Sequence, residues 1–150
     1  MKKALVIINE QHSLLPEQEK ILSDKYNYLL PRVEVEDGYD NYKYADAYED
    51  VVCRGWELLE VPAEGWSITE MKEKVEEIYN IAKKEREMTI IFVSPVPFVL
   101  KELAEISGGR ENSDIDFMEI LVFHNDNRKK KELPNGKIIS VVANKGWQLV

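Results

Sequence analysis

The sequence contains little cysteine and little glycine. Its single cysteine, Cys53, cannot form an internal disulfide, and no second cysteine or histidine pair stands near it at the spacing of a metal site. Only 7 of the 150 residues are glycine, and none belongs to a glycine-rich phosphate-binding motif. We therefore expect no bound metal, no cofactor and no classical dinucleotide-binding loop.

Long apolar runs and net positive charge are also missing. No run approaches the roughly 18 apolar residues that cross a bilayer, and the short apolar stretch after Lys3 is too brief for the core of a signal peptide. The formal net charge of −8 argues against binding to long DNA or RNA, because that affinity comes from Lys and Arg neutralising many phosphates. We expect a soluble, cytoplasmic protein that binds neither membranes nor long nucleic acid.

Apolar segments alternate with amphipathic ones along residues 1–150, which we treat as one domain. Strands are predicted at 3–9, 29–36, 56–61, 88–93, 117–123 and 137–143, and helices at 16–26, 68–87 and about 98–108. Ser67, with Glu70 three residues later, forms a capping box at the start of the second helix. Alternating strands and helices predict an α/β fold, a Rossmann-like three-layer sandwich with a mostly parallel sheet. Asn135-Gly136 predicts a C-terminal antiparallel β-hairpin.

An acidic, tyrosine-rich stretch at 37–55 interrupts this pattern, and we interpret it as an insertion. Its tyrosines are Tyr39, Tyr42, Tyr44 and Tyr48. Two roles are open for them: stacking on nucleobases, or packing the inserted loop onto the domain.

Candidate site residues follow three of the predicted strands. In an open α/β sheet, ligands bind beyond the carboxyl ends of the strands. The segments that arrive there are 9–12, 94–97 and 124–128.

His12, in a loop ahead of a helix, has the side chain of a general acid or base, or is a loop histidine bonded to backbone. The Ser94 hydroxyl lies where it would bind a phosphate or cap the following helix.

The run 127–131 concentrates four cations, Arg128, Lys129, Lys130 and Lys131, in an acidic chain. This run either attracts an anionic ligand or forms the solvated tip of a hairpin.

These segments resemble, in their order and motifs, the small CRISPR-associated proteins with a CARF-like Rossmann domain, among them proposed stand-alone ring nucleases. Asn9-(x)2-His12-Ser13-Leu14-Leu15-Pro16-Glu17-Gln18 is similar to the His-x-Leu-Thr-x-x-Gln pattern after the first strand of that family. Residues 94–101 stand at the family's ligand-facing turn, and residues 124–139 resemble its basic C-terminal hairpin. The sequence departs from the pattern at Leu15, where the family tends to have Thr.

The resemblance implies a protein that binds cyclic oligoadenylate, the second messenger of type III CRISPR immunity, and that cleaves it without metal through attack of a ribose 2′-OH. It implies that His12 acts as acid or base, that Ser94 and Asn9 orient phosphate or ribose, and that Arg128 or Lys129 stabilises developing charge. Further ligand contacts are expected from Gln11, Gln18, Pro95, Lys101, His124 and Asn125. A symmetric ring also suits a two-fold homodimer.

Two alternatives remain open at this stage. One is a sensor of the same fold that binds a nucleotide without cleaving it. The other is a non-catalytic adaptor that contacts a partner protein through its acidic insertion.

Overall fold

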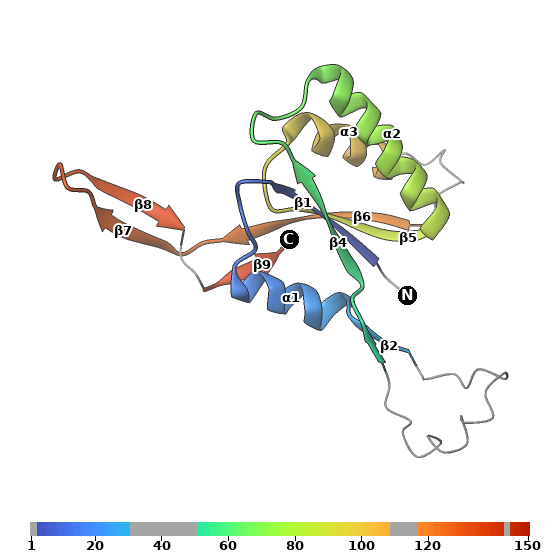
Figure 1. Cartoon of the computed structure of the whole chain (residues 1–150), viewed down its shortest axis with the longest axis horizontal. Helices are drawn as coiled ribbons and strands as arrows, with labels where there is room; N and C mark the ends of the chain where they lie inside the picture. The colour runs from blue at the N-terminus through green and yellow to red at the C-terminus, as the bar shows by residue number, and fades with distance from the viewer. Residues whose placement is uncertain (1–2, 31–50, 109–116, 143–144) are drawn as a thin grey trace, which may run out of the picture.

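The computed structural model describes residues 3–30, 51–108, 117–142 and 145–150, and its centre is a five-stranded sheet (Figure 1). The strand order is β4-β1-β5-β6-β9. Four strands are parallel, and the last is antiparallel to β6; their bounds are β1 Lys3–Asn9, β4 Trp56–Val61, β5 Glu87–Phe92, β6 Phe117–Asn125 and β9 Trp147–Leu149. The predicted α/β fold with a mostly parallel sheet is confirmed.

Helices cover both faces of this sheet (Figure 1). Helix α1 (Pro16–Tyr26) lies on one face, and α2 (Ile68–Glu85) and α3 (Pro97–Gly108) lie on the other. The chain runs from β1 outward to β4 and then returns past β1 to form β5, so the winding direction reverses between β1 and β5. Connections that run in opposite directions place their helices on opposite faces when they share one hand. The three layers are consistent with the Rossmann-like prediction.

Two hydrophobic cores explain why β1 is apolar at every position from Ala4 to Ile8. Leu5 and Ile7 of β1 pack toward α2 and α3, whereas Ala4 and Val6 pack toward α1. Successive side chains of a strand point to opposite faces, so a strand covered on both sides needs apolar residues at every position.

The starts of the helices follow local sequence signals. Pro16 occupies the first position of α1, where its missing N–H costs nothing, and the Gln18 Oε1 accepts a hydrogen bond of 3.0 Å from the Leu15 N–H. The Ser67 Oγ caps α2 by accepting the Glu70 N–H at 3.2 Å. None of the helices described is long and apolar enough to cross a membrane.

The predicted strand at 29–36 is confirmed at its start, and residues 31–36 lie outside the described residues. Strand β2 covers Tyr28–Leu30 and pairs antiparallel with β3 (Val51–Cys53) in a separate two-stranded sheet. Residues 51–53 of the predicted insertion therefore form a strand, and the sequence did not indicate its pairing with β2. Residues 31–50, including the four tyrosines, lie outside the described residues.

The C-terminal hairpin exists but is detached from the main sheet. Strand β8 (Ile138–Val142) pairs with β7 (Arg128–Glu132), and this ribbon projects away from the body (Figure 1). The basic run lies within β7 and not at the hairpin tip, which is the turn Leu133–Gly136 closed by a 2.9 Å hydrogen bond. The antiparallel strand of the main sheet is β9, which was too short to be recognised by its pattern.

Gly55 allows the end of α1 to approach the start of β4. A Cβ atom at this position would lie 1.9 Å from the Tyr26 carbonyl oxygen, a backbone atom that cannot rotate away. We expect Gly55→Ala to lower the free energy of unfolding by at least about 2 kcal/mol in urea titrations. Gly108→Ala is the control, because a Cβ there meets nothing within 4 Å, and its effect should stay within about 0.5 kcal/mol. Equal effects would contradict the close approach.

Tyr26 makes stability sensitive to alkaline pH. Burial raises the pKa of its phenol above the ordinary value of 10.0. The folded protein then holds this proton more tightly than the unfolded chain. The contribution of the phenol to the free energy of unfolding is therefore complete below the pKa of Tyr26 in the unfolded chain, and it is lost as the pH rises through the pKa in the folded protein. Between about pH 8 and about pH 11, the free energy of unfolding should fall more for the natural protein than for Tyr26→Phe. Parallel losses in urea titrations would show that Tyr26 has no such effect.

Candidate functional site

The candidate site lies where the winding of the sheet reverses, at the carboxyl ends of β1, β5 and β6. The strand registers pair Ile7 with Phe92 and Phe92 with Val122. Asn9, Ser94 and His124 each follow these paired residues by two positions, and we call these three residues the row. The ladder of β5 ends at Phe92, and beyond it the Ser94 Oγ bonds to the Asn9 N–H. The three segments selected from the sequence therefore leave the same edge side by side.

Ser94 joins the exit of β5 to the exit of β1. Its Oγ accepts a hydrogen bond of 2.8 Å from the Asn9 backbone N–H and lies 3.2 Å from the His12 Nδ1. The side chain is buried, with 5% of the residue exposed. These contacts tie the hydroxyl to the loop after β1, a role that the sequence did not indicate.

The loop that carries His12 is fixed by its own hydrogen bonds. The His12 N–H donates to the Asn9 carbonyl at 2.9 Å, and the Gln11 N–H donates to the Asn9 Oδ1 at 2.9 Å. The Glu10 Oε1 accepts the Ala63 N–H at 2.9 Å, which fastens the loop to the exit of β4. The position of His12 is therefore defined from two neighbouring strands.

This arrangement orients the His12 imidazole, which is exposed. When Nδ1 carries a proton, it donates to the Ser94 Oγ, and Nε2 is the ring nitrogen left for a ligand. A neutral ring in this tautomer offers the lone pair of Nε2 to a ligand, and an imidazolium ring offers a proton. His12 thus has the geometry of an acid or base held by a buried hydroxyl.

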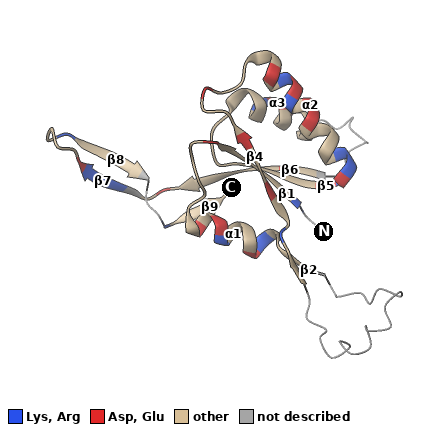
Figure 2. Ribbon diagram, in the orientation of Figure 1, with Lys and Arg blue, Asp and Glu red and all other residues tan. Residues whose placement is uncertain are grey.

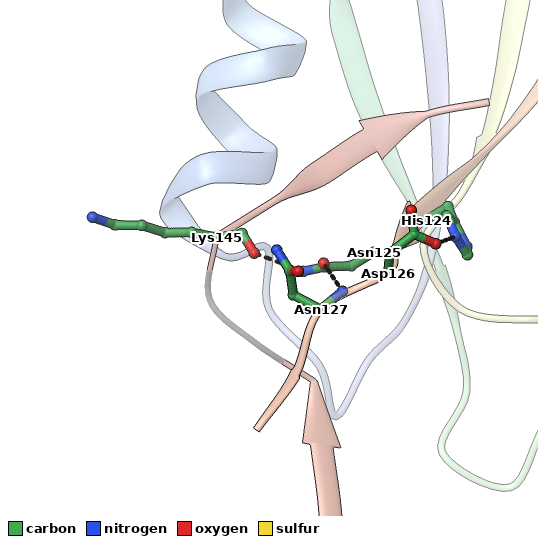
Figure 3. Close-up of polar contacts among 5 residues, drawn as sticks. All are labelled: His124, Asn125, Asp126, Asn127 and Lys145. Carbon is green, nitrogen blue, oxygen red and sulfur yellow. Dashed lines mark hydrogen bonds and ion pairs between the residues drawn. The ribbon is translucent and has the colours of Figure 1, made fainter. Parts of the chain in front are cut away.

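His124 closes the row on the β6 side. Val122 packs on the face covered by α2 and α3, so the alternation of β6 directs His124 to that same face. Its Nε2 lies 2.6 Å from the Asp126 Oδ1, and both side chains are exposed (Figure 3). The pair offers a second imidazole of fixed orientation at this edge.

Asn125 points the other way and holds the root of the ribbon. Its Nδ2 donates to the Lys145 carbonyl at 2.9 Å, and its Oδ1 accepts the Asn127 N–H at 2.9 Å (Figure 3). The residue is 3% exposed. The structure thus gives Asn125, an expected ligand contact, a role in anchoring the two ends of the ribbon.

Glu17 is a structural residue that sequence reasoning missed. Its Oε1 accepts the backbone N–H groups of Gly146 and Trp147 at 2.8 and 3.0 Å. The carboxylate at the start of α1 therefore binds the entry to β9. Its partners lie 129 and 130 residues away, so no local pattern could indicate this contact.

The other expected site residues are spread more widely. Gln18 is buried and bonds the backbone of Leu15, and Lys101 is exposed on α3, 3.8 Å from Glu102. Exposed positions are also found for Gln11, Pro95 and Lys129. The backbone of Arg128 belongs to β7, and its side chain lies outside the described residues. Contacts thus unite Asn9, His12 and Ser94, and strand register adds His124.

A cavity of about 200 Å³ lies at the opposite, amino edge of the sheet. The Arg54 guanidinium stacks 3.5 Å above the Trp56 ring in its wall, and an ion pair of 3.1 Å joins Lys3 to Glu85 there. None of the residues selected from the sequence lines this cavity. Among the residues that the structure describes, no three His, Cys, Asp or Glu side chains are grouped to hold a metal ion.

Comparisons with known proteins returned no match to a protein-family model, to a curated protein or to a solved structure.

Ser94 should be required for the stability of this edge. In Ser94→Ala the Asn9 N–H loses its buried acceptor, so we expect the free energy of unfolding to fall by about 1–3 kcal/mol. Ser107→Ala is the matched control, since that exposed hydroxyl bonds only within its own helix turn, to the Ala104 carbonyl. Its effect should remain within about 0.5 kcal/mol. Urea unfolding of both variants measures the difference, and indistinguishable values would refute the link between β1 and β5.

Proposed function

We propose that this chain is a CRISPR-associated, CARF-like protein that binds cyclic oligoadenylate at the reversal point of its sheet and cleaves it without metal. The observation that carries the proposal is the 3.2 Å contact between the His12 Nδ1 and the Ser94 Oγ. It supplies an oriented imidazole at the edge where ligands of open α/β sheets bind.

In this proposal, the hydrogen bonds to the phosphates of the ligand come from side chains more than from backbone N–H groups. Pro95 and Pro97 lack N–H groups, so the turn after β5 cannot form a continuous backbone cradle. His124 is the β6 member of the row described above, and His12 contacts its Ser94. Lys129 follows at the start of the ribbon, where basic residues gather on β7 (Figure 2). A ring with several phosphates suits donors spread over such a row.

The proposed reaction uses the ligand's own ribose as nucleophile. The neutral His12 Nε2 takes the proton of a 2′-OH, the 2′ oxygen forms a bond to the adjacent phosphorus, and the bond from phosphorus to the 5′ oxygen breaks. The products are a 2′,3′-cyclic phosphate and a 5′-OH, whose proton comes from solvent. Ser94 acts as a positioning residue, because it holds Nδ1 and so keeps Nε2 directed at the ligand.

Cleavage is tested with cyclic tetra-adenylate and cyclic hexa-adenylate in the presence of EDTA, with products resolved by chromatography. We expect linear products from the natural protein and a rate lowered about 100- to 10,000-fold in His12→Ala. Lys84→Ala is the control, because Lys84 is exposed near the end of α2, at the opposite edge of the sheet, and its rate should be unchanged.

Three results separate the possibilities. Normal turnover by His12→Ala removes the imidazole from the mechanism. Binding of either ring without any product at enzyme excess identifies a sensor instead of a nuclease. A melting temperature that neither ring raises overturns the binding proposal, since a ligand of the folded state must stabilise it.

A further inference from the structure

The ribbon of β7 and β8 has one edge that is built differently from the other. In the described part of the chain these two strands form a sheet of their own, so each has an open outer edge. Strand β7 carries lysines at 129, 130 and 131, whereas β8 reads Ile-Ile-Ser-Val-Val and contains no charge. Lysines protect an edge strand against pairing with other strands, and an uncharged β-branched edge lacks that protection.

The ribbon is also poorly covered. Ile138 is 67% exposed and Ile139 is 38% exposed, and the register places them on opposite faces, beside Glu132 and Lys131. Isolated two-stranded ribbons are marginally stable, and three or more strands are usually needed. Additional strands would form hydrogen bonds with the backbone groups of the open edge and would place side chains beside the exposed isoleucines.

We propose that β8 pairs antiparallel with β8 of a second copy of this chain, giving a four-stranded sheet in the order β7-β8-β8-β7. A two-fold axis through Ser140 pairs Ile138 with Val142 of the partner, Ile139 with Val141 of the partner, and Ser140 with its own copy. Every pair then joins apolar to apolar or hydroxyl to hydroxyl. The sequence of β8 is thus complementary to itself, as an isologous interface requires.

Charge favours this occupant over the alternatives. Pairing through the β7 edges would set lysines opposite lysines, which is unfavourable. Residues 128–142 hold one Arg, four Lys and one Glu, so the ribbon is +4 and the remainder of this −8 chain is −12. In the dimer, the two basic ribbons lie between two acidic bodies. A nucleic acid would meet the lysines but would be repelled by those bodies, and the apolar strand offers its phosphates no contact.

This dimer differs from one in which two half-sites share a single ring. The axis through Ser140 sets the two ribbon roots at opposite ends of the four-stranded sheet, at least roughly 14 Å apart for strands of five residues. Each candidate site lies beyond its own ribbon root. Each copy would therefore bind its own ligand.

Ser140→Glu provides the sharpest test. Within one ribbon Ser140 faces Lys130, so a carboxylate there leaves the hairpin intact, but at the two-fold axis it meets its own copy. Lys131→Gln is the matched control, because it changes the net charge by the same −1 on the strand that the proposal leaves outside the interface. Sedimentation velocity of the nucleotide-free proteins across a dilution series measures the oligomeric state of the natural protein and of each variant.

We expect the natural protein and Lys131→Gln to sediment with the mass of two 17.4 kDa chains, and Ser140→Glu to shift to the mass of one. Mixing Ser140→Glu with Ser140→Lys should restore the dimer, because the two charges then attract. A monomeric natural protein, a dimeric Ser140→Glu, or binding of an RNA oligonucleotide by a monomeric ribbon would overturn the proposal. Since no nucleotide is present, the result is independent of whether cyclic oligoadenylate is bound or cleaved.

Discussion

Complete burial of the central strand is the constraint on which the rest of this structure depends. Strand β1 pairs with β4 on one side and β5 on the other, so its backbone is satisfied within the sheet. Val6 and Ile7 are each 0% exposed and face opposite cores. A strand of this kind needs one helical layer over each face. The chain can provide both layers with connections of one hand only if the winding direction reverses beside β1.

The candidate site follows from the same constraint. Where β1 ends, the helices no longer cover it, and the chain must leave the sheet through groups that can form hydrogen bonds. Asn9 provides a backbone N–H to Ser94 and a carbonyl to His12. The polar groups that end two neighbouring strands thus satisfy one another, and in doing so they hold an imidazole at the surface. The His12 imidazole needs little additional structure to hold it, because the sheet already fixes Asn9 and Ser94, the two residues that His12 contacts.

Local signals explain why much of the fold could be predicted. Pro16 and Ser67 act within one turn of their own helices, so the bounds of α1 and the start of α2 were correct to the residue. The apolar stretches of β1 and β5, the second interrupted only by Thr89, likewise indicate burial on two faces. By contrast, β9 and β3 are strands of three residues whose pairing partners are distant in sequence. The basic run was not predicted as a strand, because lysines are poor indicators of strands.

The sequence predicted that three segments leave the same edge of the sheet, but it did not predict the contacts between them. The rule for open sheets selected the segments at 9, 94 and 124, and strand register brings them together. The hydrogen bond between Ser94 and Asn9 joins residues 85 positions apart, and no local pattern in either segment predicts it. Gln18 was expected to contact a ligand, and the structure adds a local role for it, because its Oε1 accepts the Leu15 N–H at the start of α1.

The end of β6 shows how the site and the ribbon are connected. His124 lies on the face of the site, and Asn125, the next residue, faces the other way and fastens the ribbon root to Lys145 and Asn127 (Figure 3). Glu17 adds a second fastening, from the first turn of the helix that follows the His12 loop. The row and the root of the ribbon therefore meet at successive residues of one strand. Because Asn125 is buried and doubly bonded, the ribbon cannot change its direction without disturbing the strand end that presents His124.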